Sequence, residues 1–404
     1  MHKKIIIQLE LFILIFGFGC QQLNFKNEGE LLTYDLGELP KTTTLKLSDL
    51  EVDDIKYIPL ETNEECFIPE ILGFNLFGKL FACKDYYIVK YFTTILKFGK
   101  DGSFIAKIGK EGRGPGEFLV AHDIDVDQKS QQIYIVDGWA RKFYIYSENG
   151  DFIRTFPAPV NTNEFVLTKN GILCYSTDIQ ATIKNSYNLI DTNGVVIWSF
   201  PNKYPWKLSS SIGTAIFNEN IFYTSSNKIF TKEVCSDTVY EYNNNTFKPH
   251  LVILHGKKLL NPRTRTASDP RDLLDNYIDQ VSLFEFGDYI YYEFKYGHSQ
   301  YSFIASKKKN FQVLTKNDFQ NETSRYTGFI NDIDGGPDIL PITIKDDNSI
   351  ISLISALNLK AFVSSEKFKS SRPQYPDKKK DLEKLAQNLK EDDNPILIVL
   401  KLKK

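Results

Sequence analysis

Three short segments of the chain repeat one pattern at nearly fixed spacing: residues 100–105 (KDGSFI), 148–153 (ENGDFI) and 192–197 (TNGVVI). Each is an Asp-Gly or Asn-Gly turn followed by β-forming residues and preceded by an apolar-rich run. The turn glycines lie 48 and then 44 residues apart. Internal repeats of about 40 to 50 residues are typical of β-propellers, in which each repeat forms one blade. The spacing therefore predicts a propeller.

The segment after Asp123 shows one blade most clearly. Four short apolar runs, at residues 124–126, 133–136, 143–146 and 152–153, are separated by turns rich in Asp, Gly, Ser and Asn. This pattern predicts a four-stranded antiparallel blade. The Asn149-Gly150 dipeptide predicts a two-residue type I′ turn in the last hairpin, because that turn needs positive φ at both central positions.

The same pattern predicts six blades along the chain: 71–108, 123–153, 164–200, 213–254, 281–314 and from 339 onward. The turns of the later blades, at 243–245 and 307–310, have lost the glycine. Apolar spacing predicts an insertion helix at 270–280 and an amphipathic helix over 382–389. A final strand over 396–402 is expected to pair with residues 55–60 in the last blade, because that pairing closes the ring without an open edge.

The first 30 residues differ from the rest of the chain. Lys3 and Lys4 precede an apolar run at 11–19, which is too short for a membrane-spanning helix of about 20 residues. This composition is typical of a secretory signal. Cys20 follows Gly19 and resembles the lipidated cysteine of bacterial lipoproteins; the alternative is a cleaved signal with an incidental Cys20. We expect a signal peptide at 1–19, a lipidated tether at 20–30 and a propeller domain at 31–404.

Charge and cysteine usage exclude several classes of function. With 49 Lys and Arg against 51 Asp and Glu, the chain lacks the basic character of nucleic-acid-binding proteins. Four cysteines follow Cys20, and none lies in a CxxC pair or near histidines at metal-ligand spacing: Cys66, Cys83, Cys174 and Cys235. We expect buried free thiols rather than disulfides, and no metal.

One short motif resembles a particular protein family. Residues 112–118 (GRGPGEF) resemble the inter-blade loop of the six-bladed β-propeller lipoproteins of Bacteroidetes, which carry NHL-like repeats. Residues 57–62 (YIPLET), the strand that ends at Asp137 and residues 382–402 agree with that family in the same order. The resemblance covers most of the mature chain. It implies a six-bladed propeller on a lipid anchor, but it identifies no biochemical activity.

The glycine-rich string does not predict a cofactor. A phosphate-binding P-loop needs Gly-Lys-Ser/Thr leading into a helix, whereas Pro115 and a predicted strand follow here. The glycines are better explained by a tight crossover between blades. Arg113 and Glu117 are candidate binding residues that either pair within this loop or face the central funnel.

Four further candidate binding residues lie near the entry of the second blade: His122, Asp123, Asp137 and Arg141. Strand ends at such positions often line the channel of a propeller. Asp123, Asp125 and Asp127 alternate along a strand but lack the glycine and glutamate of a calcium loop, and we interpret them as solvated acids rather than a funnel-facing pair.

Three arginines cluster around the predicted insertion helix: Arg263, Arg265 and Arg271. They are expected in a solvated connecting loop, with an anion contact on the propeller rim as the alternative.

The sequence favours a non-catalytic binding propeller, tethered by lipid in the cell envelope, most simply at the outer membrane. Its ligand is a glycan, a peptide or a partner protein. The alternatives are a lactonase-like or glycan-cleaving enzyme with a site in the funnel, and a structural subunit of an envelope complex. No G-x-S-x-G elbow or Ser-His-Asp order is present.

Overall fold

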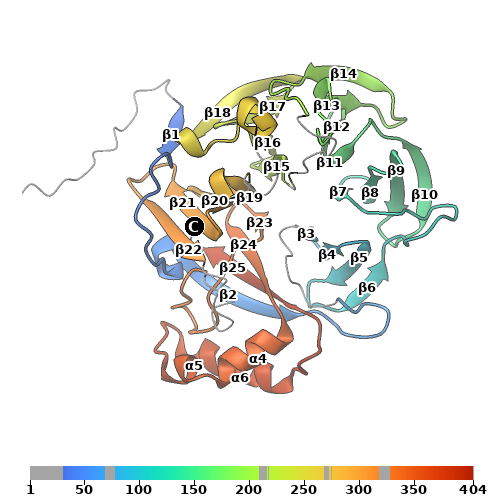
Figure 1. Ribbon diagram of the computed structural model, residues 1–404. Helices are drawn as coiled ribbons and strands as arrows, with labels where there is room; N and C mark the ends of the chain where they lie inside the picture. Colours follow the sequence, from blue (N-terminus) through green and yellow to red (C-terminus); the bar gives the residue numbers. More distant parts are fainter. Residues whose placement is uncertain are drawn as a thin grey trace, which may run out of the picture. The chain divides into compact units, whose positions relative to one another are not determined.

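Six β-sheets are arranged around a central axis as the blades of a propeller (Figure 1). The computed structural model describes residues 31–68, 78–208, 216, 218–267, 273, 275–317 and 328–403, all within one compact unit, Leu31–Lys404. The innermost strands of neighbouring blades contact one another all the way round the ring. The predicted six-bladed β-propeller of four-stranded blades is confirmed.

The first three blades are each built from one continuous segment, with strands in order from the centre outward. Blade one contains β3 (Gly78–Ala82), β4 (Tyr86–Tyr91), β5 (Thr94–Gly99) and β6 (Phe104–Lys107). Blade two contains β7 (Asp123–Asp127), β8 (Gln132–Asp137), β9 (Lys142–Ser147) and β10 (Phe152–Pro157). Blade three contains β11 (Thr162–Thr168), β12 (Gly171–Ser176), β13 (Asn185–Ile190) and β14 (Val196–Pro201).

The other three blades carry the additions to the basic pattern. Blade four contains β15 (Asn220–Ser225), β16 (Lys228–Glu233), β17 (Thr238–Asn243) and β18 (Thr246–Leu254). Blade five contains β19 (Asp279–Phe286), β20 (Tyr289–Tyr296), β21 (Ser299–Ser306) and β22 (Gln312–Asn317). Blade six contains β23 (Thr343–Asp346), β24 (Ser349–Ile354), β25 (Ile396–Leu402) and, outermost, β2 (Val52–Pro59).

Both ends of the propeller domain meet in blade six. The C-terminal β25 lies between β24 and the N-terminal β2, with Ile55 opposite Leu400 and Ile58 opposite Leu397. The expected ring closure is therefore present. A feature that we did not expect is β1 (Leu32–Asp35), which adds a fifth, parallel strand outside β18 in blade four.

The three repeated turns join the third and fourth strands of blades one to three. In the turn of blade two, the Gly150 N–H donates to the Ser147 carbonyl at 3.0 Å, and the Ser147 N–H donates to the Asp151 carbonyl at 2.8 Å. Gly150 has φ +90°, whereas Asn149 is not among the residues with positive φ. The turn is thus a type I turn with a glycine bulge, and the predicted type I′ turn is wrong. Type I′ geometry occurs in blade four, where Asn244 and Asn245 both have positive φ.

Each turn glycine also touches the preceding blade. A Cβ on Gly102, Gly150 or Gly194 would lie 2.0 to 2.3 Å from the carbonyl oxygen of Pro59, Lys107 or Pro157, respectively. These three residues end the outermost strands β2, β6 and β10. The outermost strands therefore follow one another head to tail around the rim, and only glycine allows the contact.

Most of the described helices lie in two insertions. Before blade five, η2 (Gly256–Lys258) and α2 (Pro262–Ala267) come earlier than the helix predicted at 270–280. Residues 270–272 and 274 lie outside the described residues; Leu273, Asp275 and Asn276 are helical, but β19 begins at Asp279, so the predicted end is wrong. A short η1 (Leu47–Leu50) precedes β2.

The second insertion lies between β24 and β25, where blades one and two have tight turns. It contains α4 (Ala356–Ser364), α5 (Glu366–Ser370) and α6 (Pro376–Asn388), which pack together beside blade six (Figure 1). The amphipathic helix predicted at 382–389 is confirmed within α6, which buries Leu382 and Ala386. Among the described residues, no helix is long and apolar enough to cross a membrane.

Candidate functional site

The inner strands of all six blades surround a central cavity of about 1900 Å³. Its wall receives side chains from β3, β7, β11, β15, β19 and β23. The charged and aromatic groups described below gather on the part of the wall formed by blades one to four. This cavity is the candidate site, because ligands bind in concave sites with a few placed polar groups.

Two carboxylates on β7 connect blade two to blade three. Asp123 accepts a hydrogen bond from the Phe165 N–H at 3.0 Å, and Asp125 accepts one from the Leu167 N–H at 2.8 Å. Since alternate residues of a strand share one face, both carboxylates reach the same neighbouring strand, β11. The interpretation of these two residues as solvated acids is wrong, whereas Asp127 does cap the turn at Lys129 and Ser130.

Two lysines of blade one add positive charge to this wall. The Lys79 ammonium lies 2.7 Å from Asp123 Oδ1. Burial opposes its charge, but the carboxylates of Asp123 and Asp125 raise the pKa of Lys79. Lys90 is buried, and that burial lowers its pKa to about 8.

Two acidic groups on the wall have raised pKa values. Burial raises the pKa of Asp125 to about 6. Burial, and then the negative charge of Asp123, raise the pKa of Glu164 well above its usual range. Glu164 Oε2 accepts a hydrogen bond from Asn220 Nδ2 at 3.2 Å. The wall therefore combines amide and ammonium donors with carboxyl groups whose pKa values are raised.

Exposed aromatic rings lie at one end of the cavity. Phe92 follows β4 and Trp139 follows β8, so both occupy the turn between the second and third strands of their blades. They are 50% and 74% exposed, respectively, and both line the cavity. The His122 ring meets Trp139 edge-on at 5.5 Å. His122 Nδ1 accepts the Gly138 N–H at 3.1 Å, which leaves Nε2 to carry the proton, and burial lowers the pKa of His122.

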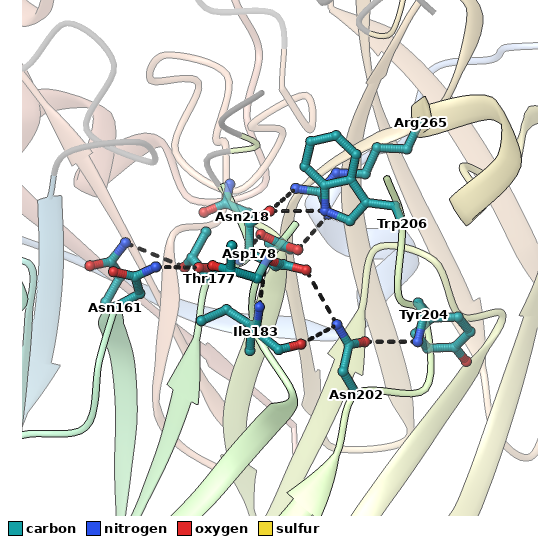
Figure 2. Close-up of polar contacts among 12 residues, drawn as sticks. Asn161, Thr177, Asp178, Ile183, Asn202, Tyr204, Trp206, Asn218 and Arg265 are labelled. Carbon is teal, nitrogen blue, oxygen red and sulfur yellow. Dashed lines mark hydrogen bonds and ion pairs between the residues drawn. The ribbon is translucent and has the colours of Figure 1, made fainter. Parts of the chain in front are cut away.

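A buried polar network supports the wall between blades three and four (Figure 2). Arg265 lies 2.6 Å from Glu219 Oε1, donates to the Asp178 carbonyl at 2.9 Å and stacks over Trp206 at 4.4 Å. Trp206 Nε1 donates to the same carbonyl at 3.0 Å. The adjacent Thr177 lines the cavity, so the network holds that loop in place.

Within the described ranges, no group of three or more His, Cys, Asp or Glu side chains is placed to hold a metal ion. The four described cysteines are all buried and free.

A family model described as "Domain of unknown function (DUF4934)" matches residues 32–401. The chain belongs to the DUF4934 family. The match spans the whole propeller, from β1 to the closing strand β25. No curated protein matches the chain.

Two solved structures from Bacteroides resemble this DUF4934 chain. One is a Bacteroides fragilis protein whose name describes it as exported; it has a TM-score of 0.68 and 15% identity over 93% of this chain and 100% of that chain. The other is a DUF4221 family member from Bacteroides vulgatus, with a TM-score of 0.50 and 10% identity over 87% of this chain and 97% of that chain. At these identities the likeness concerns the fold.

The candidate binding residues of this DUF4934 chain lie in different surroundings. His122 and Asp123 line the cavity. Asp137 is fully buried, and its two oxygens accept four backbone N–H groups, from Leu119, Val120, Trp139 and Ala140. Arg141 is exposed at φ +52° in the same turn. Asp137 therefore shapes the loop that presents Trp139.

The GRGPGEF string, between blades one and two, packs against blade two. Glu117 accepts the Gly114 N–H at 2.8 Å and lies 3.4 Å from the Lys110 ammonium, and these contacts lower its pKa. Phe118 is fully buried, edge-on to Tyr144 and Tyr146. Glu117 thus pairs within the loop, although with Lys110 rather than with the exposed Arg113.

Of the three clustered arginines, Arg265 lies neither in a solvated loop nor at an anion contact on the rim. That residue is 3% exposed and paired with Glu219, so it is neither solvated nor available to an anion. Arg263 is exposed, and Arg271 lies outside the described residues.

Sequence reasoning missed Lys79, Lys90, Phe92, Trp139 and Glu164. Two of these residues have a sequence feature that could have identified them. Lys90 is the only charge within the apolar run 86–91 (YYIVKY), and Trp139 follows Asp-Gly in a turn, where a large ring has little to pack against.

Proposed function

We propose that the protein is an exported, lipid-anchored β-propeller of the cell envelope that binds a glycan in its central cavity without transforming it. The signal-like residues 1–19 and Cys20 support export and anchoring, as does the resemblance to NHL-like propeller lipoproteins. The similar Bacteroides fragilis protein is itself described as exported. Cys20 lies outside the described residues.

The cavity is the observation that carries the proposal. Exposed Phe92 and Trp139 rings at one end provide flat apolar faces for the C–H groups of sugar rings. Lys79, His122 and Asn220 on the wall offer donors and acceptors for hydroxyl groups. A volume of about 1900 Å³ exceeds the about 300 to 1000 Å³ of sites for drug-sized ligands, so an oligosaccharide fits the cavity better than a monosaccharide.

The enzyme alternative has less support. Glycoside hydrolysis generally uses two carboxyl groups that flank the scissile bond. Here Asp123 and Asp125 bind backbone N–H groups of β11, and Asp123 also pairs with Lys79. Glu164 remains as the acid with a strongly raised pKa, and the neighbouring carboxylate, Asp123, is already engaged by Lys79 and the Phe165 N–H.

Calorimetric titration of the full chain with a panel of envelope and host oligosaccharides tests the binding. We expect at least one oligosaccharide to bind, and Trp139→Ala to weaken its affinity by about tenfold or more, because a stacked aromatic face is lost. Trp198→Ala is the matched control, since Trp198 is 53% exposed but lies on the outermost strand β14. Equal affinity for wild type and Trp139→Ala would contradict the proposal.

Anchoring is tested separately. A Cys20→Ala variant should lose metabolic labelling with a fatty acid and leave the membrane fraction, whereas the buried-thiol control Cys174→Ala should keep both. Retention of lipid and membrane association by Cys20→Ala would show that the chain is not anchored at this residue.

A further inference from the structure

The outermost strand of blade three, β14, is an unusually apolar sheet edge. Val196, Ile197 and Trp198 on this strand, and Val195 before it, are 49 to 61% exposed. Among the described residues, β14 pairs with β13 on one side only. An edge strand presents unpaired N–H and C=O groups, and proteins usually protect such an edge with charged side chains.

β14 lacks that protection, whereas the other outermost strands have it. It contains no charged residue, and none occurs from 192 to 202. The other five outermost strands each carry at least one charge: Asp35 in β1, Asp54 in β2, Lys107 in β6, Arg154 in β10 and Lys316 in β22.

A strand bulge does not account for the difference. In blades one to three the pairing of the outermost strand shifts at the same position, three residues after the turn glycine. The residue at the shift is Ile105, Ile153 or Ile197, and each is 44 to 49% exposed. The bulge is thus common to three blades, and the absence of charge distinguishes β14.

The neighbouring blade shows how the chain treats a comparable edge. β18 also carries an apolar run at its end, residues 251–254 (LVIL). There the chain adds its own strand β1 in parallel, with Leu32 opposite Leu251 and Tyr34 opposite Ile253. Leu251 and Ile253 are fully buried. The edge of β18 is therefore covered by another strand of the chain, whereas no described strand pairs with the outer edge of β14.

We propose that β14 pairs with β14 of a second copy of this chain, in antiparallel orientation about a two-fold axis. Residue 197 is midway between Asp191 and Lys203, the charges that flank the uncharged segment. Antiparallel pairing brings the Asp191 end of one copy to the Lys203 end of the other, whereas parallel pairing would bring like charges together. Ile197 then faces Ile197 of the other copy and Val196 faces its Trp198, so the same apolar surface is used on both sides, as a two-fold interface requires. This dimer does not depend on glycan binding.

Sedimentation velocity of the full chain in density-matched detergent tests the dimer. We expect wild type to dimerise with rising concentration. Val196→Lys should weaken the dimer by about tenfold or more, because each copy then places an unpaired ammonium group opposite Trp198 of the other in the apolar interface. Ile153→Lys on β10 is the matched control: it places the same charge at a comparably exposed position of another outermost strand and should leave the dimer intact.

A cysteine in place of Ile197 should also form an intermolecular disulfide under mild oxidation, whereas Ile153→Cys should not. Positions 153, 196 and 197 are all exposed, so we expect the variants to fold. Melting temperatures close to that of wild type would confirm it. A wild type that stays monomeric up to submillimolar concentration overturns the proposal, as does an Ile153→Lys variant that dissociates to the same extent as Val196→Lys.

Discussion

The rim contacts of the first half of the ring, blades one to three, differ in kind from the contacts between blades four and five in the second half. In the first half of the ring, a turn glycine of each blade rests against the last carbonyl of the preceding outermost strand. In the second half the interface between blades four and five contains a buried polar network. Glu285 of β19 meets Tyr223, His250 and Lys307 at 2.7 to 2.8 Å, and Lys232 of β16 donates to Gln280 at 3.1 Å.

The difference shows that one propeller can be joined by backbone geometry or by side-chain networks. A backbone contact leaves a sequence pattern, because only glycine fits there. A side-chain network assembles residues far apart in sequence, and no local pattern marks it. Variants that attack the two kinds of contact should therefore differ in their dependence on pH.

The largest effect is expected where the two halves meet in blade six. Deleting residues 395–404 removes β25 and with it the pairing of both β2 and β24. The loss should remove most of the about 5 to 15 kcal/mol that typically separates folded from unfolded domains, so cooperative thermal unfolding should disappear in calorimetry. Deletion of residues 403–404 leaves β25 in place and serves as the control. A cooperative transition near the wild-type temperature would show that the ring does not need this strand.

Glu285→Gln tests the buried network of the second half. Glu285 is 3% exposed; burial opposes its charge, but hydrogen bonds from His250 and Lys307 lower its pKa to about 2. Removing one partner of a buried ion pair typically costs about 3 to 5 kcal/mol. Because the folded pKa is lowered, this stabilisation is present above the unfolded pKa and is lost as pH falls from about 4.5 toward 2. Denaturant titrations measure the difference in unfolding free energy between wild type and Glu285→Gln. This difference should be largest at pH 7 and should decrease as pH falls from about 4.5 toward 2. A difference that stays constant would argue against the ion pair.

Gly150→Ala tests the backbone contact of the first half. Gly150 has φ +90°, and a Cβ there would lie 2.3 Å from the Lys107 carbonyl oxygen. Backbone strain and the clash together should cost about 3 kcal/mol, independently of pH. Gly297→Ala is the control, because Gly297 has φ +56° with nothing within 4 Å of its Cβ position and should lose only about 1 kcal/mol. Equal losses in urea unfolding would mean that the contact with blade one is unimportant.

His255 should give the second half a further, smaller dependence on pH. It is fully buried between Asp237 at 2.6 Å and Tyr292 at 3.2 Å. Burial, and then the positive charge of Lys232, lower its pKa to about 4. The unfolded chain therefore binds the proton first, and wild type should lose about 2 kcal/mol between pH 7 and pH 5 through this residue. The stability difference between wild type and His255→Gln should narrow over that range, and a difference that stays constant would exclude this role.

The propeller fold could be predicted from the sequence because blades one to three share a repeated glycine turn. The glycines at 102, 150 and 194 are visible because a positive φ and a close backbone approach both exclude other residues. The strand pairing of residues 55–60 with 396–402 followed from the need to close a ring. The parallel strand β1 could not be predicted, because its four residues carry no pattern that specifies a partner.

The residues that line the cavity could be predicted only in part. His122 and Asp123 lie where strand-end reasoning placed them, but the same reasoning selected Asp137, whose oxygens bind four backbone N–H groups. A carboxylate that organises a loop and one that faces a ligand look alike in sequence. Lys79 and Glu164 belong to different blades, and only the ring brings each of them near Asp123.

The position of β1 has a mechanical consequence. Tension applied to the chain before Leu31 would reach β1 first, and β2, which closes the ring, only after β1 has separated from β18. The pairing of β1 spans four residues at the periphery of blade four, and peripheral strands open at a lower free energy than core strands. The first unfolding step under load would then be reversible detachment of one short strand, with the six blades still assembled.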